Sequence, residues 1–271
     1  MGANNILIMA KIFITGSADG LGHLAARELI RLGHDVILHA RSMERGKQAR
    51  EKLRGAKDVL VADLSSIEAT KALASDANAL GPFDAVIHNA GVYQIPRDSV
   101  GAEGLPVLFA VNSLAPYILT CLLKRPERLI YLSSGMHLQG DPGLGNLPLD
   151  LLKKGRLPTY SDTKLHDLIL SMAVARKWTD VYSNAVDPGW VPTKMGGAGA
   201  PDSLEKGFET QVWLAVSNDA GATVSGRYFH HKRQADFLPA AKDMAVQERL
   251  LAAFEKVTGV RFMAENDSSI N

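Results

Sequence analysis

The chain has 271 residues, of which 46% are hydrophobic and 22% are charged, a composition typical of a folded globular protein. Thirty basic residues against 29 acidic residues give a net charge of +1, which excludes binding of nucleic acid or anionic lipid through bulk charge. The single cysteine, Cys121, excludes an intrachain disulfide and is compatible with a reducing compartment, so we predict a cytoplasmic protein.

The N-terminal segment is apolar, but we do not expect it to span a membrane. Lys11 interrupts the stretch NILIMAKIFITG, and each half is far too short to cross a bilayer. Met9 stands just before a clear strand pattern. We therefore predict that residues 1–9 form an N-terminal extension and that residues 10–271 form one domain.

Short apolar runs rich in Val, Ile or aromatic residues alternate with longer stretches of helical pattern. The predicted strands are 11–15, 35–40, 58–63, 84–89, 128–133, 181–186 and 226–230. The predicted helices are 21–32, 43–54, 66–79, 105–124, 159–177, 203–217 and 239–257. This alternation indicates right-handed crossovers and a parallel sheet with helices on both faces. We predict an α/β fold in three layers, with a doubly wound parallel sheet of about seven strands.

Two long segments, 135–158 and 188–207, are rich in Gly and Pro and follow predicted strands. Loops of this length in a compact domain are usually functional or mobile. Because both follow strands, we expect them at the carboxyl edge of the sheet, where open α/β sheets bind ligands.

A glycine-rich turn follows the first predicted strand and precedes a helix. Gly16, Gly20 and Gly22 have the spacing G-x-x-x-G-x-G. Glycine allows a tight turn and close approach of a pyrophosphate, while the helix N-terminus supplies amide groups and a positive dipole end. Tight turns need glycine for other reasons as well, but this position in a parallel sheet favours dinucleotide binding.

Tyr160 and Lys164 lie one turn apart at the start of a predicted helix and share one face of it. A free tyrosine has a pKa of about 10, too high for efficient proton exchange near neutrality. A nearby ammonium group stabilises the phenolate and lowers that pKa. The spacing occurs by chance in many helices, so the pair is informative only together with other motifs.

Six motifs occur in the order found in the short-chain dehydrogenases/reductases. They are Gly16-Gly20-Gly22, HNAG (His88–Gly91), VN (Val111–Asn112), LSS (Leu132–Ser134), YSDTK (Tyr160–Lys164) and DPGWVPT (Asp187–Thr193). The chain resembles the non-extended branch of this family over most of its length. The resemblance implies a Rossmann-type fold, a nicotinamide cofactor, and hydride transfer to or from a carbonyl carbon.

The resemblance also assigns four catalytic residues. Tyr160 is the general acid that protonates the nascent alkoxide during reduction, and Lys164 lowers its pKa and holds the ribose hydroxyls. Ser134 polarises the substrate carbonyl, and Asn112 organises a water-mediated proton relay toward Lys164. Each residue alone has a structural alternative: a surface tyrosine, a strand-end hydrogen-bonding serine, or a helix-interior amide. Their combination favours the reactive interpretation.

Only one of Ser133 and Ser134 is expected to face the site, because side chains alternate along a strand. The family pattern favours Ser134. It lies 26 positions before Tyr160, an interval about twice as long as is common in the family. This insertion resembles the branch that contains the retinol dehydrogenases, and it argues against analogy with compact sugar or acyl-carrier reductases.

The resemblance places the cofactor against residues from several loops. They are Gly16, Ser17, Asp19, Gly20, Leu21, Gly22, Arg41, Ser42, Asp63, Leu64, Asn89, Ala90, Gly91, Tyr160, Lys164, Pro188, Gly189, Val191 and Thr193. Asp63 is expected to bond the adenine edge or to cap the next helix. Thr193 is expected to bond the nicotinamide carboxamide.

The end of the second strand bears on the choice between NAD(H) and NADP(H). Folds that select NAD tend to place a carboxylate here, whereas a 2′-phosphate favours arginine. Ala40 leaves the carboxylate position empty and Arg41 follows it, with Ser42 or Arg45 available to assist. Asp19 argues for NAD because its charge would oppose a phosphate, and Arg41 has the alternative of a plain surface charge. We predict NADP(H).

Loop residues at the carboxyl edge are candidates for the substrate pocket. They are Tyr93, Met136, His137, Trp190 and Met195. They indicate an apolar or aromatic carbonyl or alcohol substrate, although loop aromatics also pack on their own scaffold. His137 and the pair His230-His231 lack metal-ligand spacing, so we predict no metal site.

Two other functions share part of this pattern. An extended-branch epimerase or dehydratase also has Tyr-x-x-x-Lys, but the short region after residue 187 and the glycine spacing disfavour it. A redox-sensing protein would bind NADP(H) without turnover, yet such proteins typically lose the tyrosine or the lysine.

The resemblance further implies a homodimer or homotetramer. Relatives associate through the helices predicted here at 159–177 and 203–217. The first carries Leu165, Leu168, Ile169 and Met172, which either face a partner or pack on the sheet.

Overall fold

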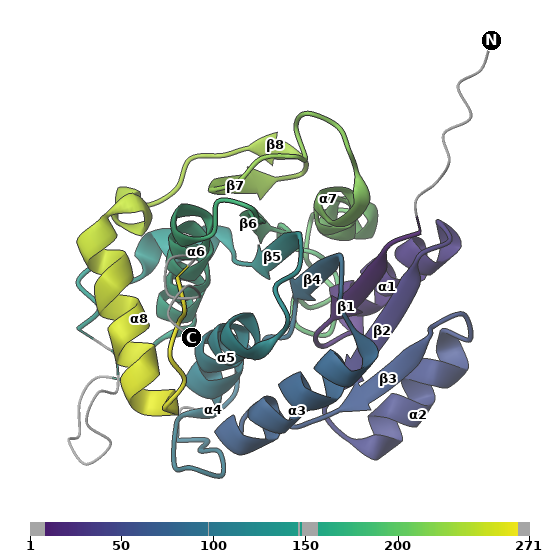
Figure 1. Cartoon of the computed structure of the whole chain (residues 1–271), viewed down its shortest axis with the longest axis horizontal. Coiled ribbons are helices and arrows are strands. Elements are labelled where there is room, and N and C mark those ends of the chain that lie inside the picture. Colours follow the sequence, from purple (N-terminus) through teal and green to yellow (C-terminus); the bar gives the residue numbers. More distant parts are fainter. Residues whose placement is uncertain (1–8, 97, 146, 148–156, 265–271) are drawn as a thin grey trace.

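The computed structural model describes residues 9–96, 98–145, 147 and 157–264, and Figure 1 shows a central sheet with helices on both faces. The predicted extension therefore lies outside the described residues, apart from Met9. The strands are β1 (Lys11–Ile14), β2 (Asp35–Ala40), β3 (Asp58–Val61), β4 (Ala85–His88), β5 (Arg128–Leu132), β6 (Tyr182–Asp187), β7 (Arg227–His230) and β8 (Arg233–Gln234). The α-helices are α1 (Gly20–Arg31), α2 (Met43–Lys52), α3 (Ile67–Leu80), α4 (Val107–Phe109), α5 (Ala115–Leu122), α6 (Tyr160–Lys177), α7 (Leu204–Val216) and α8 (Met244–Thr258).

The sheet has the order β3-β2-β1-β4-β5-β6-β7-β8, and β1 to β7 all run parallel. The predicted doubly wound parallel sheet is therefore confirmed. The prediction missed β8, a two-residue strand that pairs antiparallel with β7. His231 and Lys232 connect the two strands with φ values of 48° and 61°, the left-handed conformation that tight hairpin turns require.

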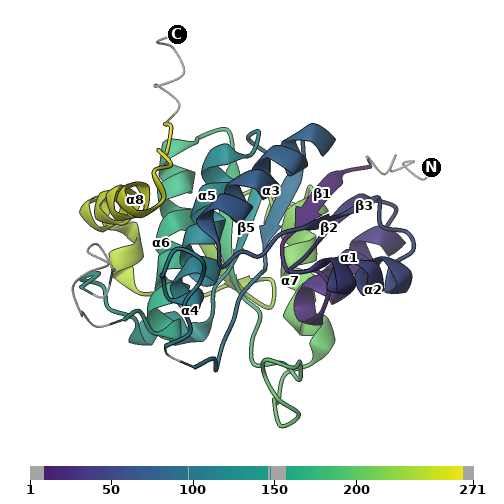
Figure 2. The ribbon, with the colours of Figure 1, turned by 90° about the horizontal axis from the view of Figure 1, so that it is seen from below.

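The two faces of the sheet form two separate hydrophobic clusters. Phe13 and Val86 point to the face covered by α3, α5, α6 and α8, whereas Ile12, Ile14 and Ile87 point to the face covered by α1, α2 and α7. This alternation follows from the two-residue period of a strand. Figure 2 shows these helices on either side of the sheet. Within the described residues, no helix is long and apolar enough to cross a membrane.

The helix predicted at 105–124 is interrupted. It consists of α4, a π-helical segment from Ala110 to Leu114, and α5. Pro116 supplies a physical reason, because proline has no N–H to donate to the carbonyl of Asn112, four residues earlier, and its ring clashes there. Asn112 consequently lies in a widened helical turn, a feature often found at functional sites.

The helix α6 is enclosed by its own chain. Every residue from Ser161 to Val174 is buried, and α8 packs against α6, as Figures 1 and 2 both show. Leu165 and Leu168 therefore belong to the core that α6 shares with the sheet and α8. Of the two alternatives for these side chains, the structure supports packing within the chain, and α6 presents no free apolar face to a partner.

Candidate active site

A cavity of about 530 Å³ opens at the carboxyl edge of the sheet. It lies where the strand order reverses between β1 and β4, and it is lined by residues that follow β1, β2, β3, β4, β5 and β6. Such a reversal leaves a crevice between two loops that diverge to opposite faces of the sheet. This cavity is a candidate ligand site, and of the two long loops the segment 188–207 contributes to its lining, through Pro188, Thr193, Lys194 and Met195.

In the glycine-rich turn, Gly16 and Gly22 are packed too tightly for side chains. Gly16 has φ +65°, and a Cβ there would stand 2.8 Å from the Cα of Ala90. A Cβ on Gly22 would stand 2.3 Å from Nδ2 of Asn89 and 2.8 Å from the Gly16 carbonyl oxygen. Asn89 in turn donates to the carbonyls of Thr15 and Gly16. The turn after β1 and the segment after β4 thus form one wall of the cavity.

His39, at the end of β2, supports this turn and was not identified from the sequence. Its Nδ1 accepts from the backbone N–H of Gly16 at 2.9 Å, and its Nε2 lies 3.1 Å from the carbonyl of Ala62. Burial lowers the pKa of His39 to about 4. The ring is therefore neutral, with its proton on Nε2 bonded to Ala62. Ser17 contributes as well, because its hydroxyl accepts from the N–H of His39 at 2.8 Å.

Asp19 caps α1 and is neutralised by two cations. It accepts from the N–H of Gly20, and its carboxylate lies 2.6 Å from Nζ of Lys194 and 3.5 Å from the Arg45 guanidinium. The hydrogen bond from Lys194 holds the pKa of Asp19 below its ordinary value. The sequence indicated Asp19 as an unopposed charge beside a phosphate. Lys194, 175 residues away along the chain, changes that interpretation.

Tyr160 is the first residue of α6, and a capping box fixes where that helix begins. The Thr159 hydroxyl accepts from the N–H of Asp162, and the Asp162 carboxylate accepts from the N–H of Thr159 at 2.7 Å. The Tyr160 ring packs on Tyr93, with centroids 4.5 Å apart. Burial raises the pKa of Tyr160, and the Lys164 ammonium opposes that increase.

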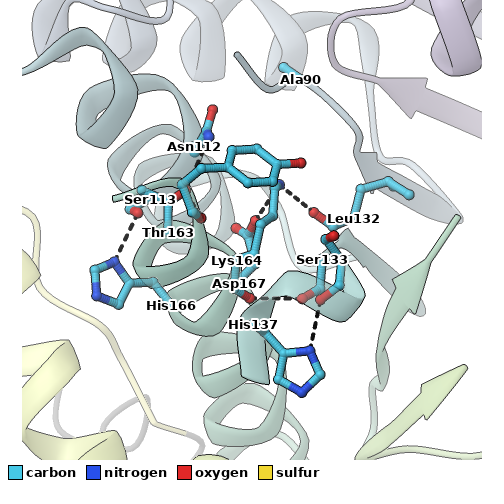
Figure 3. Close-up of polar contacts among 12 residues, drawn as sticks. Ala90, Asn112, Ser113, Leu132, Ser133, His137, Thr163, Lys164, His166 and Asp167 are labelled. Carbon is cyan, nitrogen blue, oxygen red and sulfur yellow. Dashed lines mark hydrogen bonds and ion pairs between the residues drawn. The ribbon is translucent and has the colours of Figure 1, made fainter. Parts of the chain in front are cut away.

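Lys164 lies beneath the Tyr160 ring and is held by two acceptors. Its Nζ is 5.7 Å from the ring centroid, 2.6 Å from the carbonyl oxygen of Leu132 and 2.8 Å from Oδ2 of Asp167. Figure 3 shows these two bonds converging on the ammonium group. Asp167 was missed in the sequence, although it stands one helical turn after Lys164. Spacing alone does not reveal that the carboxylate points inward and is buried.

Asn112 connects the π-helical segment to two neighbouring elements. Its side chain accepts from the N–H of Val92 at 2.8 Å and donates to the Val92 carbonyl at 3.0 Å and to the Thr163 hydroxyl at 3.1 Å. It is fully buried. A Cβ on Gly91 would lie 3.5 Å from Asn112 Oδ1 and 3.7 Å from Lys164 Nζ, so both polar groups border that glycine.

The two serines after β5 have different partners. Ser133 is buried and donates its hydroxyl to the carbonyl of Lys164 at 2.8 Å, as Figure 3 shows. Ser134 is half-buried, and its hydroxyl accepts from the N–H of Met136. Of the two serines only Ser133 is among the residues that line the large cavity, whereas Ser134 was expected to face the site. The hydroxyl of Ser133 is bonded to α6.

His137 is a structural residue in this fold. It is completely buried, its Nδ1 donates to the Ser134 carbonyl at 2.7 Å, and its Nε2 accepts from the N–H of Leu238. Burial lowers its pKa. Trp190 is exposed and donates to the carbonyl of Gly196 within its own loop. Both residues were candidates for the substrate pocket, but these bonds hold them in the scaffold.

A smaller cavity of about 170 Å³ is also lined by Tyr160. Its lining is mainly apolar and comes from the segment after β4, from α4 and from the residues just before α6. The lining residues are Tyr93, Gln94, Ile95, Pro96, Ser99, Pro106, Leu108, Leu157, Pro158, Thr159 and Tyr160. Of the predicted substrate residues only Tyr93 is among them.

Most of the predicted cofactor residues meet at the large cavity. Those that line it are Gly16, Asp19, Gly20, Leu21, Arg41, Asp63, Leu64, Asn89, Ala90, Gly91, Tyr160, Lys164, Pro188 and Thr193, together with the substrate candidate Met195. Those outside its lining are Ser17, Gly22, Ser42, Gly189 and Val191, the catalytic candidates Asn112 and Ser134, and the substrate candidates Met136, His137 and Trp190. Ser42 instead caps α2.

In the described part of the chain, no group of three or more His, Cys, Asp or Glu side chains is arranged to hold a metal ion.

Comparison with known proteins places this site in a family. The short chain dehydrogenase family model matches residues 10–126. The chain is 43% identical over 262 residues to the short-chain dehydrogenase chyC of Penicillium rubens, covering 94% of this chain and 100% of that protein. It is 43% identical over 257 residues to an uncharacterized oxidoreductase of Emericella nidulans, covering 93% and 98%. The chain therefore belongs to the short-chain dehydrogenase/reductase family.

The protein is an oxidoreductase of that class. Retinol dehydrogenase 14 of Mus musculus is 30% identical over 290 residues, covering 92% of this chain and 86% of that protein, so the resemblance to retinol dehydrogenases is confirmed. Among solved structures, a protein from Mycobacterium paratuberculosis has a TM-score of 0.76 at 22% identity, covering 94% of this chain and 95% of that chain. The Pseudomonas aeruginosa RhlG/NADP complex has a TM-score of 0.63 at 20% identity, covering 82% and 94%. These two structures share the fold.

Proposed function

We propose that this protein is an NADP(H)-dependent oxidoreductase that interconverts a carbonyl compound and an alcohol, with Tyr160 as the general acid and base. The observation that carries this proposal is the pair formed by Tyr160 and Lys164. Both line the large cavity beside the glycine-rich turn, with the ammonium 5.7 Å from the ring centroid of the phenol. A proton donor thus stands beside a site whose shape suits a dinucleotide.

The residues of the large cavity fit a nicotinamide dinucleotide. Gly20 and Leu21 line the cavity at the N-terminus of α1, and a Cβ on Gly20 would meet nothing within 4 Å, so the space beside this helix end is open to a ligand. Gly20 and Asn89 would hold the pyrophosphate and the backbone beside it, and Lys164 would hold the ribose hydroxyls. The bound cofactor supplies or accepts the hydride.

The protein's own groups manage the proton. During reduction, the Tyr160 hydroxyl donates its proton to the alkoxide oxygen that forms from the carbonyl. The Lys164 ammonium stabilises the resulting phenolate, and Ser134 orients the carbonyl oxygen. Asn112 would support a water chain that returns the proton toward Lys164. Positioned proton transfer of this kind contributes about 10²–10⁴-fold in rate.

The preference for NADP(H) rests on charge at the adenosine end of the cavity. Arg41, Arg45 and Lys194 line it, and the Asp19 carboxylate there is paired with two of these cations. A 2′-phosphate would therefore meet a net positive surface. The RhlG complex, which shares the fold, is named as an NADP complex, in agreement with this proposal.

The test of cofactor preference is the variant Arg41→Ala. We expect its affinity for NADPH to fall about tenfold or more, because a hydrogen bond to a charged group contributes about 1.5–3 kcal/mol, while affinity for NADH changes little. Fluorescence titration of both nucleotides measures this. The control is Arg50→Ala, which removes an exposed arginine of α2 that pairs with Asp58 and does not line the cavity. Equal or stronger NADH binding by the unaltered protein would contradict the proposal.

The smaller cavity supports an apolar substrate. Its lining beside Tyr160 is mostly Pro, Leu, Ile and Tyr, so it suits the apolar part of a carbonyl compound whose oxygen faces the phenol. We propose this cavity as the substrate pocket, in place of the pocket that Met136, His137 and Trp190 were expected to form.

Filling this cavity tests the assignment. Leu108→Trp is expected to raise KM for carbonyl compounds with a bulky apolar group about tenfold or more, with a smaller effect on short aldehydes, because the added ring occupies the pocket. Steady-state kinetics with a series of chain lengths measures the difference. Leu138→Trp is the control, since Leu138 is exposed and lines neither cavity. A rise in KM independent of substrate size would count against the pocket.

A non-catalytic NADP(H) sensor is the second candidate function, because the large cavity alone accounts for binding. The presence of Tyr160, Lys164, Ser134 and Asn112 favours turnover. Oxidation of NADPH by any member of a panel of carbonyl compounds separates the two functions.

A cytoplasmic location and a homodimer or homotetramer remain part of the proposal, with the contact surface outside the enclosed helix α6.

A further inference from the structure

Asp167 is the partner of Lys164 inside α6. The two side chains are almost fully buried, and their charged atoms lie 2.8 Å apart. The carbonyl oxygen of Leu132 accepts a second hydrogen bond from the ammonium, as Figure 3 shows. An ammonium has three protons, so one remains for the cavity that Lys164 lines. The orientation of that proton depends on the other two bonds.

We propose that Asp167 is a positioning residue that holds the Lys164 ammonium in place and cancels part of its positive charge at Tyr160. With less positive charge beside it, the phenol keeps its proton over a wider pH range. That suits carbonyl reduction, in which the phenol must be protonated to donate. The inference rests on the proposed role of Tyr160 as the acid and names a residue that controls it.

The charges around Tyr160 support this role. Four ionisable groups face it from three parts of the fold: Lys164 and Asp167 on α6, Tyr93 after β4, and Asp187 at the end of β6. Burial raises the pKa of Tyr160, Lys164 lowers it, and Asp167 raises it more than Tyr93 or Asp187 does. Although burial disfavours the ammonium, the Asp167 carboxylate holds the pKa of Lys164 above its ordinary value.

A purely structural role accounts poorly for a carboxylate at this position. Burial raises the pKa of Asp167 because an ionised carboxylate is costly to remove from water. Its surroundings include Tyr131 of β5, whose own pKa burial also raises, and the buried residues of α6 that follow it are Leu168, Ile169 and Leu170. An apolar side chain would avoid this cost. The pairing with Lys164 therefore accounts for a carboxylate at position 167.

Titration of the Tyr160 phenol tests the proposal without cofactor or substrate. Ultraviolet difference absorbance between the unaltered protein and Tyr160→Phe isolates this phenolate. We expect a midpoint above the ordinary value of about 10 in the unaltered protein. Asp167→Asn keeps the size of the side chain and removes its charge, so its midpoint is expected to fall by about 1 pH unit or more. Asp187→Asn, with its weaker influence on Tyr160, is expected to shift the midpoint less.

The pH dependence of the reduction rate is a second measurement. In Asp167→Asn, the upper pH limit of NADPH-dependent reduction should fall together with the midpoint of phenolate formation. Equal midpoints in the two proteins would overturn the proposal. The proposal would also be overturned if Asp167→Asn loses reduction as the pH rises while Tyr160 remains protonated, because Lys164 would then be the group that releases its proton. If Asp167→Asn does not fold, titration of Tyr160 in the unaltered protein still tests the proposal. A midpoint of phenolate formation at or below about 8 is incompatible with partial cancellation of the ammonium charge. The expected midpoints without any reductase activity would contradict the proposed function and not this inference.

Discussion

Tyr160→Phe is expected to lower the rate of carbonyl reduction by about 10²–10⁴-fold, the contribution of a positioned proton donor. The variant removes one oxygen atom and keeps the ring that packs on Tyr93 with centroids 4.5 Å apart. NADPH binding should therefore change little, because the wall formed by Gly16 and Asn89 is untouched. Comparison of kcat with NADPH affinity measured by fluorescence separates the two effects.

The matched control for this variant is Tyr93→Phe, which removes the hydroxyl of the neighbouring ring. Tyr93 borders the smaller cavity and packs on Tyr160, but the proposed mechanism gives its hydroxyl no proton to transfer. We expect Tyr93→Phe to retain most of the rate. Equal losses of reduction rate in Tyr160→Phe and Tyr93→Phe would mean that both hydroxyls support the geometry of the site, and would contradict Tyr160 as the general acid.

Lys164→Met is expected to lower the free energy of unfolding by about 3–5 kcal/mol near pH 9, because it leaves the buried carboxyl of Asp167 without its counter-charge. It should also abolish detectable reduction, because the phenolate of Tyr160 loses its stabilising cation. Denaturant unfolding measured at several pH values gives the first quantity. The expected pH dependence has a definite sign.

Without the ammonium, the pKa of Asp167 in the folded protein rises further above the unfolded value of about 3.9. The folded protein must then keep a proton that the unfolded chain releases. In the unaltered protein burial already raises the pKa of Asp167 to about 6, so both folded proteins keep this proton between about pH 4 and pH 6. The loss of stability in Lys164→Met relative to the unaltered protein is therefore small below about pH 6 and grows as the pH rises above that value, by at most about 1.4 kcal/mol per pH unit. It stops growing once the carboxyl ionises in the folded protein.

The double variant Lys164→Met with Asp167→Asn separates stability from catalysis. It removes both charges and leaves an uncharged amide beside methionine, so we expect most of the lost stability to return and the pH dependence to disappear. Activity should stay absent. If the double variant is as unstable as Lys164→Met, or if the loss is the same at every pH, the buried ion pair is not the source of the effect.

Much of the fold followed from local patterns in the sequence. Each parallel strand is a short apolar run between helices, and every predicted strand coincides with an observed strand to within two residues at either end. The glycine spacing after β1 was also readable, because a tight turn before a helix needs glycine. The four-residue spacing of Tyr160 and Lys164 was readable because one helical turn brings these two positions onto one face. The eighth strand was not, because two residues, Arg233 and Gln234, are too few to form a pattern.

The site depended more on tertiary structure. The interruption of the helix at 105–124 arises where Pro116 disturbs the turn that contains Asn112, and the apolar pattern continues through it. The pairing of Lys194 with Asp19 and the bond from Gly16 to His39 join residues far apart in the chain. Periodicity reports only which face of one element a residue occupies, so it cannot indicate such partners.

The sequence by itself determined the family, the order of strands and helices, and the pair of Tyr160, the proposed proton donor, and Lys164. Only the tertiary structure decided what surrounds them: a buried carboxylate, Asp167, against Lys164, and a mainly apolar cavity that Tyr160 lines. The physical reason is that charge and solvation at a reactive group depend on every element packed around it. Asp167 stands one turn from Lys164 in the sequence, but its effect comes from the burial that α8, β5 and β6 impose on α6.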